Sequence, residues 1–267
     1  MTTNVIVCGA AGRMGKQLVS LVHENPAARL VGAVEAVGHT AIGKDAGEVA
    51  GIGPIGIPIS ADYEALVTAN TVTLDFTIPE AALAHLRTAV AKQAAIVIGT
   101  TGFSAEQRAE AEAIAPQTRS VIAPNMSIGV NVLLKVVADV AKILNEGFDP
   151  EIVEIHHRFK VDAPSGTALA LGRAIAVAQG KDFDRQAKLA RQGITGQRTD
   201  DEIGIVALRG GDAVGDHTVV FTGFGERLEL THRAQSRECL ARGAIRAALW
   251  LPSQKPGLYS MKEVLGL

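Results

Sequence analysis

Nearly continuous hydrophobic runs of strand length alternate with amphipathic segments through the first half of the chain. The runs are NVIVC (4–8), RLVGAV (29–34), TVTLDF (71–76), AAIVIG (94–99) and SVIAP (120–124). Strands that are covered on both faces, as in a parallel sheet, have this pattern. The segments with apolar residues at helical spacing are 13–24, 79–92 and 104–115. The alternation predicts an α/β fold with a Rossmann-like, doubly wound parallel sheet.

The pattern changes after Asn125. An amphipathic helix over about 128–145 precedes the alternating segment EIVEIHH and a further helix near 166–179. Three later segments, GIVALR (204–209), HTVVFTG (217–223) and ERLELTHRA (226–234), alternate mostly with a period of two. Such alternation is typical of a sheet with one covered face. We therefore expect a second, α+β domain with a mixed or antiparallel sheet.

Two domains follow from this division of patterns. We expect the first over residues 1–126 and the second over residues 127–240, with 241–267, including most of a final helix, returning to the first domain. The segment 43–60 is rich in Gly and Pro and is predicted to be a loop or flap. The segment LPSQKPGLYSM (251–261) is predicted to be a closing loop.

Composition narrows the functional class. The chain has 267 residues, 47% of them hydrophobic, and a formal net charge of −2. It therefore lacks the positive field by which proteins hold nucleic acid or anionic membranes. No stretch reaches ~18 uninterrupted apolar residues, so we expect no membrane-spanning helix. Cys8 and Cys239 are the only cysteines, which favours the reducing cytoplasm over a disulfide-rich class.

The sequence VIVCGAAGRMGKQL places Gly9, Gly12 and Gly15 between the first expected strand and its helix. A tight turn, a backbone that approaches a pyrophosphate, and a helix packed close to the strand each exclude a Cβ. The helix N-terminus offers N–H groups and a partial positive charge to phosphate. The spacing is GxxGxxG, not the commoner GxGxxG, and a plain strand–turn–helix link is the alternative. In this context the loop favours a dinucleotide-binding domain.

Glu35 follows the second expected strand, twenty residues past Gly15. A carboxylate there accepts hydrogen bonds from an adenosine ribose diol. It also repels a 2′-phosphate, and the next residue is Ala36, not the arginine that such a phosphate favours. Arg13 and Lys16 are the cations that would partly substitute. We therefore expect NADH to be used at least as well as NADPH.

Two more short loops follow expected strands. IGTTGF places Gly99, Thr100 and Thr101 after one strand, and APNMS places residues 123–126 after the next. Ligands in open α/β sheets lie beyond the carboxyl ends of the strands. These loops are therefore candidates to contact the nicotinamide and its ribose, although either alone also fits an ordinary loop.

Four basic residues are crowded at the start of HHRFKVDAPSGT. If the preceding strand continues through them, His156 and Arg158 face one side while His157 and Phe159 face the other. Because surface cations repel one another, such a cluster indicates that these residues bind a negatively charged partner. A zinc site formed with His217 and His232 is an alternative, but no metal-ligand spacing supports it. A nucleic-acid patch would need interleaved aromatics and a positive domain.

A helix start follows the basic residues directly. Ser165 is a good N-cap, and Gly166 and Thr167 would present backbone N–H groups to a ligand. Cations and N–H groups that converge in this way suit a small dianion such as a dicarboxylate. His156 supplies a proton near neutral pH, and Lys160 brings a point charge and a second acid.

Several motifs together resemble one family. GAAGRMG, DFTIPE, GTTGF, APNMSIGVN, EIHHRFKVDAPSGTALALG and ERLELTHRAQSR, in this order, are similar to the 4-hydroxy-tetrahydrodipicolinate reductase (dihydrodipicolinate reductase) family of bacterial lysine and diaminopimelate biosynthesis. The likeness runs almost from end to end. The block EIHHRFKVDAPSGTALALG is far more specific than the glycine loop.

The resemblance implies a role for each matching residue. His156 matches a proton donor or acceptor and Lys160 a proton donor, while His157, Gly166 and Thr167 match substrate contacts. Arg237 is a lower-ranked candidate for a second substrate carboxylate. The matching cofactor residues are Gly9, Ala10, Ala11, Gly12, Arg13, Met14, Glu35, Gly99, Thr100, Thr101, Ala123, Pro124, Asn125 and Met126. No metal is implied.

The resemblance also implies the reaction and the assembly. The family reduces 4-hydroxy-tetrahydrodipicolinate to tetrahydrodipicolinate with NADH or NADPH, and it is usually a cytoplasmic homotetramer built by sheet pairing between second domains. The second domain over residues 127–240 would then bind the substrate and form the oligomer. Two alternatives stay open: another two-domain nicotinamide oxidoreductase acting on an aldehyde or sugar, and a dinucleotide-sensing regulator in which His156 and Lys160 are idle.

Overall fold

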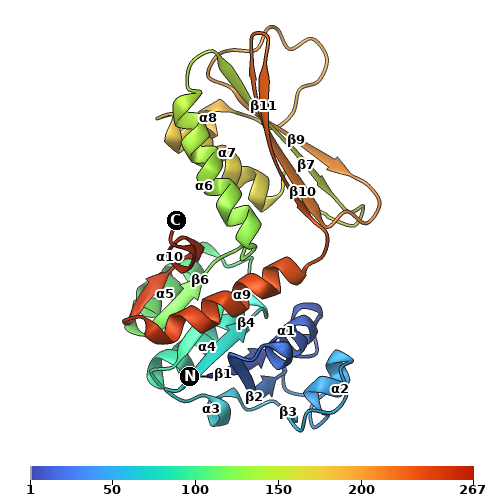
Figure 1. The fold of residues 1–267 in the computed structure, drawn as a ribbon, viewed down its shortest axis with the longest axis vertical. Helices are drawn as coiled ribbons and strands as arrows, with labels where there is room; N and C mark the ends of the chain where they lie inside the picture. The colour runs from blue at the N-terminus through green and yellow to red at the C-terminus, as the bar shows by residue number, and fades with distance from the viewer. Residues whose placement is uncertain (1) are drawn as a thin grey trace. The chain divides into compact units, whose positions relative to one another are not determined.

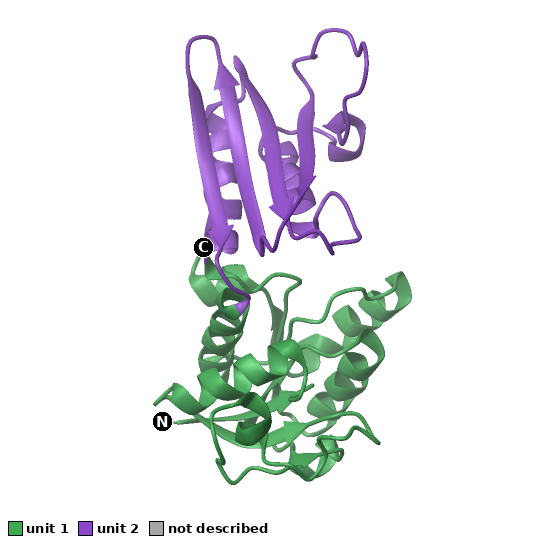
Figure 2. Ribbon diagram, turned by 90° about the vertical axis from the view of Figure 1, so that its right-hand side faces the viewer, with its two compact units in different colours: residues 1–128, 238–267 green, residues 129–237 purple. Residues whose placement is uncertain are grey.

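The computed structural model describes residues 2–267, which divide into two compact units. One unit comprises residues 1–128 and 238–267, and the other comprises residues 129–237 (Figure 2). The expected divisions lie after residues 126 and 240. Each unit has its own sheet and its own hydrophobic core.

An all-parallel seven-stranded sheet, in the order β12-β6-β5-β4-β1-β2-β3, forms the centre of the first unit. Its strands are β1 (Thr3–Cys8), β2 (Ala28–Val34), β3 (Ile59–Ser60), β4 (Thr71–Asp75), β5 (Ala95–Ile98), β6 (Arg119–Ile122) and β12 (Gly257–Tyr259). Every residue of β4 and β5 is buried, as expected from hydrophobic runs covered on both sides. The α/β, Rossmann-like fold class is therefore confirmed.

Helices cover both faces of this sheet (Figure 1). In β1, Val5 and Val7 pack into one core while Ile6 and Cys8 pack into the other. The first core contains residues of α1 (Arg13–Glu24), α2 (Ala46–Ala50), α9 (Glu238–Trp250), η2 (Leu251–Ser253) and α10 (Met261–Leu265). The second contains residues of α3 (Tyr63–Leu66), α4 (Pro79–Ala91), α5 (Ala105–Ile114) and η1 (Ala115–Gln117).

The second unit is built on a mixed five-stranded sheet in the order β11-β10-β7-β9-β8. Its strands are β7 (Phe148–His156), β8 (Ala187–Lys188), β9 (Ile203–Arg209), β10 (Gly215–Gly223) and β11 (Arg227–Ala234), and its helices are α6 (Ile128–Ile143), α7 (Gly166–Ala178) and α8 (Phe183–Gln186). Ile152, Ile205, Val219 and Phe221 pack against the helices on one face. Figure 2 shows this sheet with its helices behind it, so that its other face carries no helix.

Two segments predicted to be loops contain regular structure. The segment 43–60 holds α2 and β3, because the Asp45 carboxylate accepts hydrogen bonds from five backbone amides of this segment. The segment 251–261 holds η2 and β12, which pairs with β6 and places Leu258 and Tyr259 in different cores. Both predictions were wrong because strands of two or three residues are too short to show alternation.

Candidate active site

The glycine loop lies at the carboxyl end of β1, where the sheet order reverses between β2 and β4. Gly9 has φ of +73°, and its N–H donates to the Val34 carbonyl oxygen at 2.9 Å. A Cβ on Gly15 would lie 1.9 Å from the carbonyl oxygen of Gly9 and 2.7 Å from Cα of Ala10. The close packing of α1 on the loop therefore requires glycine at position 15.

The start of α1 is suited to an anion. Its N-cap residue, Gly12, has no side chain to satisfy the first amides, and the first turn, which includes Arg13 and Met14, contains no acidic residue. Backbone N–H groups and the positive end of the helix dipole thus point beyond the sheet. The loop fits the pyrophosphate of a dinucleotide.

The Glu35 carboxylate also supports the glycine loop. One of its oxygens accepts the N–H of Ala11 at 2.8 Å and the other accepts the N–H of Ala36 at 3.1 Å. Each carboxylate oxygen has a further lone pair that a ribose hydroxyl would use. Ala36 is exposed and supplies no cation beside this carboxylate.

Asp75, at the end of β4, organises the neighbouring loops and was missed from the sequence. One oxygen of this buried carboxylate accepts from the N–H and hydroxyl of Thr77 at 2.9 and 2.6 Å, and from the Thr100 hydroxyl at 3.3 Å. The other oxygen contacts Nδ1 of His85 at 2.6 Å. Its backbone carbonyl accepts the N–H of Gly99 at 2.9 Å. In the sequence, the motif DFT (75–77) at the end of an expected strand could have indicated this role of Asp75.

The fourteen expected cofactor residues meet at one edge of this sheet. Parallel strands bring their carboxyl ends together, so the loops after β1, β2, β5 and β6 are neighbours. Thr101 is exposed there, and the N–H of Ala123 donates to Ile98 at 3.1 Å. Asn125 accepts the N–H of Ser127 at 2.9 Å. Pro124 is exposed, while Met126 packs into the core.

The basic segment is not a continued strand. β7 ends at His156, and residues 157–160 form a turn in which the Lys160 N–H donates to the His157 carbonyl at 3.1 Å. The expected alternation through Arg158 and Phe159 is therefore wrong, and both side chains are exposed. The turn directs Lys160 toward Asp162, whose two oxygens lie 2.8 and 3.0 Å from its Nζ. This hydrogen bond lowers the pKa of Asp162.

A buried carboxylate, Glu154, joins the end of β7 to the start of α7. Its oxygens contact Nδ1 of His156 at 2.5 Å, the N–H of Ser165 at 3.0 Å and both terminal nitrogens of Arg209 at 2.9 Å. Ser165 also contacts Nε2 of His217 at 3.0 Å. Burial, together with the nearby His156, lowers the pKa of His217 to about 4, so this ring is neutral at pH 7.

The start of α7 fits the expected carboxylate cradle. The Ser165 hydroxyl accepts the N–H of Ala168 at 3.2 Å, as an N-cap does. Gly166 is exposed, and a Cβ built on it meets nothing within 4 Å, so space lies open beside the first turn that also includes Thr167. Nδ1 of His157 is buried without a hydrogen-bond partner among the described residues. A ligand carboxylate would satisfy such a group.

The sequence predicted His156, His157, Lys160, Gly166 and Thr167 as site residues but did not predict the residues that surround them in the structure. These are Glu154, Asp162, Arg209 and His217. Glu154 carried a signal, since an acid two residues before a histidine in a strand lies on the same face. Arg209 and His217 gave no such signal in the sequence, because only strand pairing brings them near Glu154 and Ser165. Arg237 is absent from this hydrogen-bonded cluster in the described chain and lies directly before α9.

Among the described residues, only Cys8, Asp75 and His85 form a group of three metal-ligating side chains. Asp75 already bonds to Thr77 and His85, and burial followed by the charge of Asp75 raises the pKa of the Cys8 thiol. Asp75 and His85 are thus already paired with each other, and the buried Cys8 thiol stays protonated. His217 and His232, opposite one another on β10 and β11, have no third ligand in residues 2–267.

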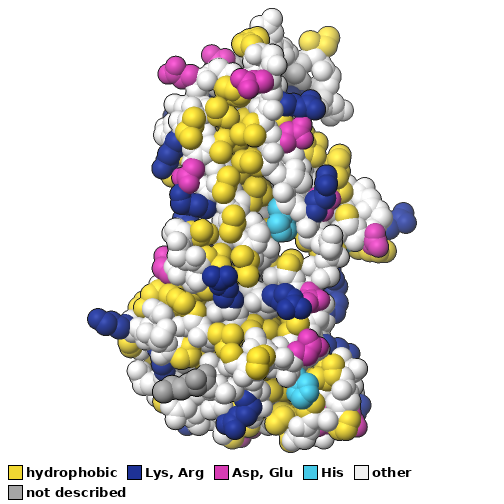
Figure 3. Space-filling model, in the orientation of Figure 1, with side chains coloured by type: hydrophobic (Ala, Val, Ile, Leu, Met, Phe, Trp, Pro, Cys, Tyr) yellow, Lys and Arg dark blue, Asp and Glu magenta, His cyan; other side chains and the backbone are white. Residues whose placement is uncertain are grey.

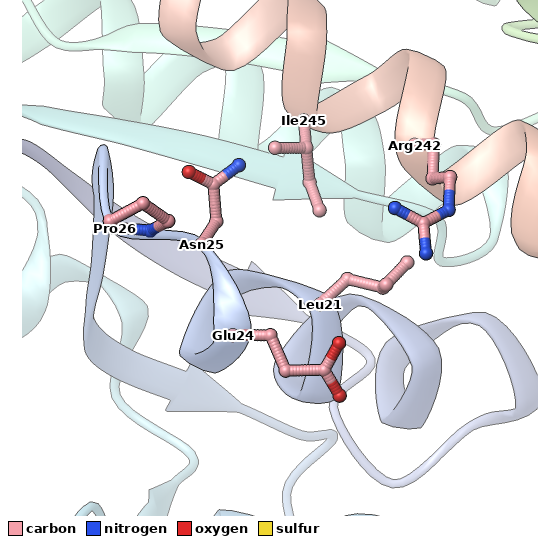
Figure 4. A pocket seen from close by; sticks show the side chains of 6 residues that line it. All are labelled: Leu21, Glu24, Asn25, Pro26, Arg242 and Ile245. Atoms are coloured by element: carbon pink, nitrogen blue, oxygen red, sulfur yellow. The ribbon is translucent and has the colours of Figure 1, made fainter.

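One surface pocket lies apart from the residues described above. Figure 4 shows a pocket of about 310 Å³ in the first unit, lined by Leu21, Glu24, Asn25, Pro26, Arg242 and Ile245. Arg242 bonds there to Glu238 of its own helix, and the pocket contains none of the expected cofactor residues. On the face drawn in Figure 3, acidic and basic side chains are interspersed. None of the described helices has the length and hydropathy needed to cross a membrane.

Comparisons with known proteins agree across the full length. Family models described as dihydrodipicolinate reductase, N-terminus and C-terminus, match residues 3–126 and 129–265. A 4-hydroxy-tetrahydrodipicolinate reductase of Geotalea uraniireducens is 52% identical, with 98% of each chain covered, and one of Geobacter sulfurreducens is 49% identical, with 99% covered. The dipicolinate-bound dihydrodipicolinate reductase of Paenisporosarcina is 25% identical, with a TM-score of 0.77 over 98% of this chain and 99% of that one.

Proposed function

The chain belongs to the dihydrodipicolinate reductase family, and on this premise we propose how its residues reduce 4-hydroxy-tetrahydrodipicolinate to tetrahydrodipicolinate. It is an NAD(P)H-dependent oxidoreductase of lysine and diaminopimelate biosynthesis. The observation that carries the assignment of residues is the meeting of His156, Lys160 and the open start of α7 at the end of β7. An enzyme acting on a neutral aldehyde or sugar has no use for such a cradle.

The second unit binds the dicarboxylate substrate. One carboxylate lies at the first turn of α7, where the N–H groups of Gly166 and Thr167 and the helix dipole stabilise negative charge. His157, whose Nδ1 has no partner among the described residues, donates a hydrogen bond to a substrate carboxylate. Lys160 adds positive charge. The Paenisporosarcina relative binds dipicolinate, an aromatic ring with two carboxylates, and the proposed substrate is also a ring with two carboxylates.

The proton chemistry belongs to His156 and Lys160. Loss of water from the substrate gives a conjugated cyclic imine, and the bound dinucleotide supplies the hydride. Negative charge then develops toward the ring nitrogen, and one proton must arrive to balance the reaction. One member of the pair Lys160 and His156 donates that proton to the substrate as the charge forms, which is general acid catalysis worth about 10²–10⁴-fold. The net change consumes one reduced nucleotide and one proton and releases water.

The cofactor residues favour NADH at least as much as NADPH. Glu35 is held in place by Ala11 and Ala36 and presents negative charge where a 2′-phosphate would lie. The expected result of an assay that follows nicotinamide absorbance with freshly made substrate is turnover with both nucleotides. We expect kcat/KM to be at least as high with NADH.

The same assay separates the alternatives. Nucleotide binding without turnover would favour a sensing regulator. Turnover of a neutral aldehyde but not of the dicarboxylate would favour another oxidoreductase. A strong preference for NADPH would contradict the role given to Glu35 and Ala36 while leaving the reaction itself intact.

The open face of the five-stranded sheet forms the homotetramer in this proposal. Val153, Ile155, Val206, Leu208 and Val220 lie on that face, and Val206 and Leu208 are 43% and 46% exposed. Exposed contiguous apolar surface of this kind marks protein–protein interfaces.

Light scattering should therefore give about four times the 27.8 kDa chain mass. Leu208→Glu should dissociate the oligomer, whereas Val177→Glu, at an exposed position of α7, should not. A monomeric wild-type protein would contradict this.

A further inference from the structure

Glu154 is a fully buried carboxylate to which three elements, β7, β9 and the start of α7, each supply a donor. The hydrogen bonds come from His156 on its own strand, Arg209 on β9 and Ser165 at the start of α7. Burial raises the pKa of Glu154, but the bonds from Arg209, His156 and Ser165 outweigh it and hold the pKa below its ordinary value. The group is therefore ionised at neutral pH, as a buried acid can be only when its partners compensate its desolvation.

An ionised carboxylate fixes the chemistry of the His156 ring. It can only accept hydrogen bonds, so Nδ1 of His156, 2.5 Å away, carries the proton in the neutral ring. Nε2 is then the nitrogen that gains and loses the exchangeable proton. The ring is also confined, because a Cβ on Gly215 would lie 2.9 Å from Nε2.

Arg209 links both proton-donating side chains to the same carboxylate. Its two terminal nitrogens bind the two oxygens of Glu154, and one of them also donates to the carbonyl oxygen of Asp162 at 2.6 Å. Asp162 in turn binds Lys160 through its side chain. A bidentate guanidinium contact of this type fixes geometry as well as charge.

The other charged groups around His156 do not replace Glu154. His217 on β10 faces the ring edge-on, with centroids 5.2 Å apart, and is neutral at pH 7. Lys160 and Arg209 are cations, which oppose protonation of His156. Asp162 is engaged by Lys160. Glu154 is thus the one anion among the described residues that bonds directly to His156.

We propose that Glu154, held by Arg209 and by the N-cap amide of α7, is the positioning residue that sets the tautomer and the orientation of the His156 ring. The inference rests on the proposed function, in which His156 handles a proton. Glu154 itself touches neither substrate nor cofactor. Its effect reaches the reaction through the histidine ring.

The test is Glu154→Gln. Its amide has one oxygen, which Arg209 and Ser165 occupy, so its NH₂ group turns toward Nδ1 and reverses the tautomer. We expect kcat to fall roughly 10- to 100-fold with the substrate KM changed less than about threefold. Because the ring loses the anion that it contacts, the alkaline fall of the kcat–pH profile should move to lower pH.

A second readout needs no turnover. Diethyl pyrocarbonate modifies neutral histidine, and mass spectrometry with fragmentation of the peptide distinguishes His156 from the adjacent His157. In the full-length variant this modification should begin at lower pH than in the wild type. The matched control is Glu151→Gln, which removes another arginine-paired carboxylate of β7. It should shift neither profile.

The outcomes separate the two proposals. A wild-type protein without turnover overturns the proposed function, whereas the modification profile still tests Glu154. A variant with reduced kcat but unshifted profiles would show a merely structural role and overturn the inference.

Should Glu154→Gln fail to fold, Glu154→Asp keeps the charge but withdraws it from the ring. Its kcat should fall with a smaller shift of the same sign, and unchanged kinetics there would also overturn the inference.

Discussion

Replacing Lys160 with alanine is expected to lower kcat by about 10²- to 10⁴-fold while the dissociation constant of NADH stays unchanged. Lys160 supplies a proton and positive charge as electrons reach the substrate ring. Its ammonium is held by Asp162 in the second unit, whereas the glycine loop belongs to the first. Steady-state kinetics gives kcat, and fluorescence titration gives the dissociation constant.

Two further variants separate charge from proton donation. Lys160→Arg keeps the positive charge, but a guanidinium does not release its proton near neutral pH. It should therefore bind pyridine-2,6-dicarboxylate much better than Lys160→Ala does and still turn over slowly. Lys135→Ala, which removes a paired surface lysine of α6, should keep kcat within about twofold. If Lys160→Ala kept wild-type kcat, the role of this residue would be refuted.

Gly15→Ala is expected to weaken NADH binding by at least about 100-fold. The added Cβ would lie 1.9 Å from the Gly9 carbonyl oxygen, and backbone atoms cannot be moved aside as a flexible side chain can. The loop must shift, and its N–H groups then no longer converge on the pyrophosphate. Overpacking of this kind also costs about 1–3 kcal/mol of stability. Titration of the variant with NADH measures the loss.

Gly12→Ala places a methyl group in the same loop with a milder clash, and its NADH affinity is compared with that of Gly15→Ala. Its Cβ would lie 3.1 Å from the same carbonyl oxygen, which requires only a small adjustment. Affinity should fall less than for Gly15→Ala, and thermal unfolding should show both proteins folded. Equal affinity of wild type and Gly15→Ala would contradict the close-approach role of the glycine.

Local pattern in the sequence determined the first unit. The hydrophobic runs predicted the buried parallel strands, and Gly9, Gly12 and Gly15 marked the loop at the switch point. These features depend on neighbours a few residues apart, so spacing reveals them. The short strands β3 and β12 were not predicted, because two or three residues are too few to show a hydrophobic pattern. In the second unit, the sequence predicted the start of α7, whereas the basic segment forms a turn and not the expected continuation of the strand.

Only the tertiary structure decided what surrounds those residues. Arg209 lies 55 positions from Glu154, and His217 lies 52 positions from Ser165. The pairing of β7 with β9 and β10 brings them together, and strand register is set by packing over the whole sheet. The ionisation of Glu154 likewise depends on burial and on donors from three elements. The sequence therefore predicted which groups do the chemistry, whereas the fold decided which residues hydrogen-bond to them.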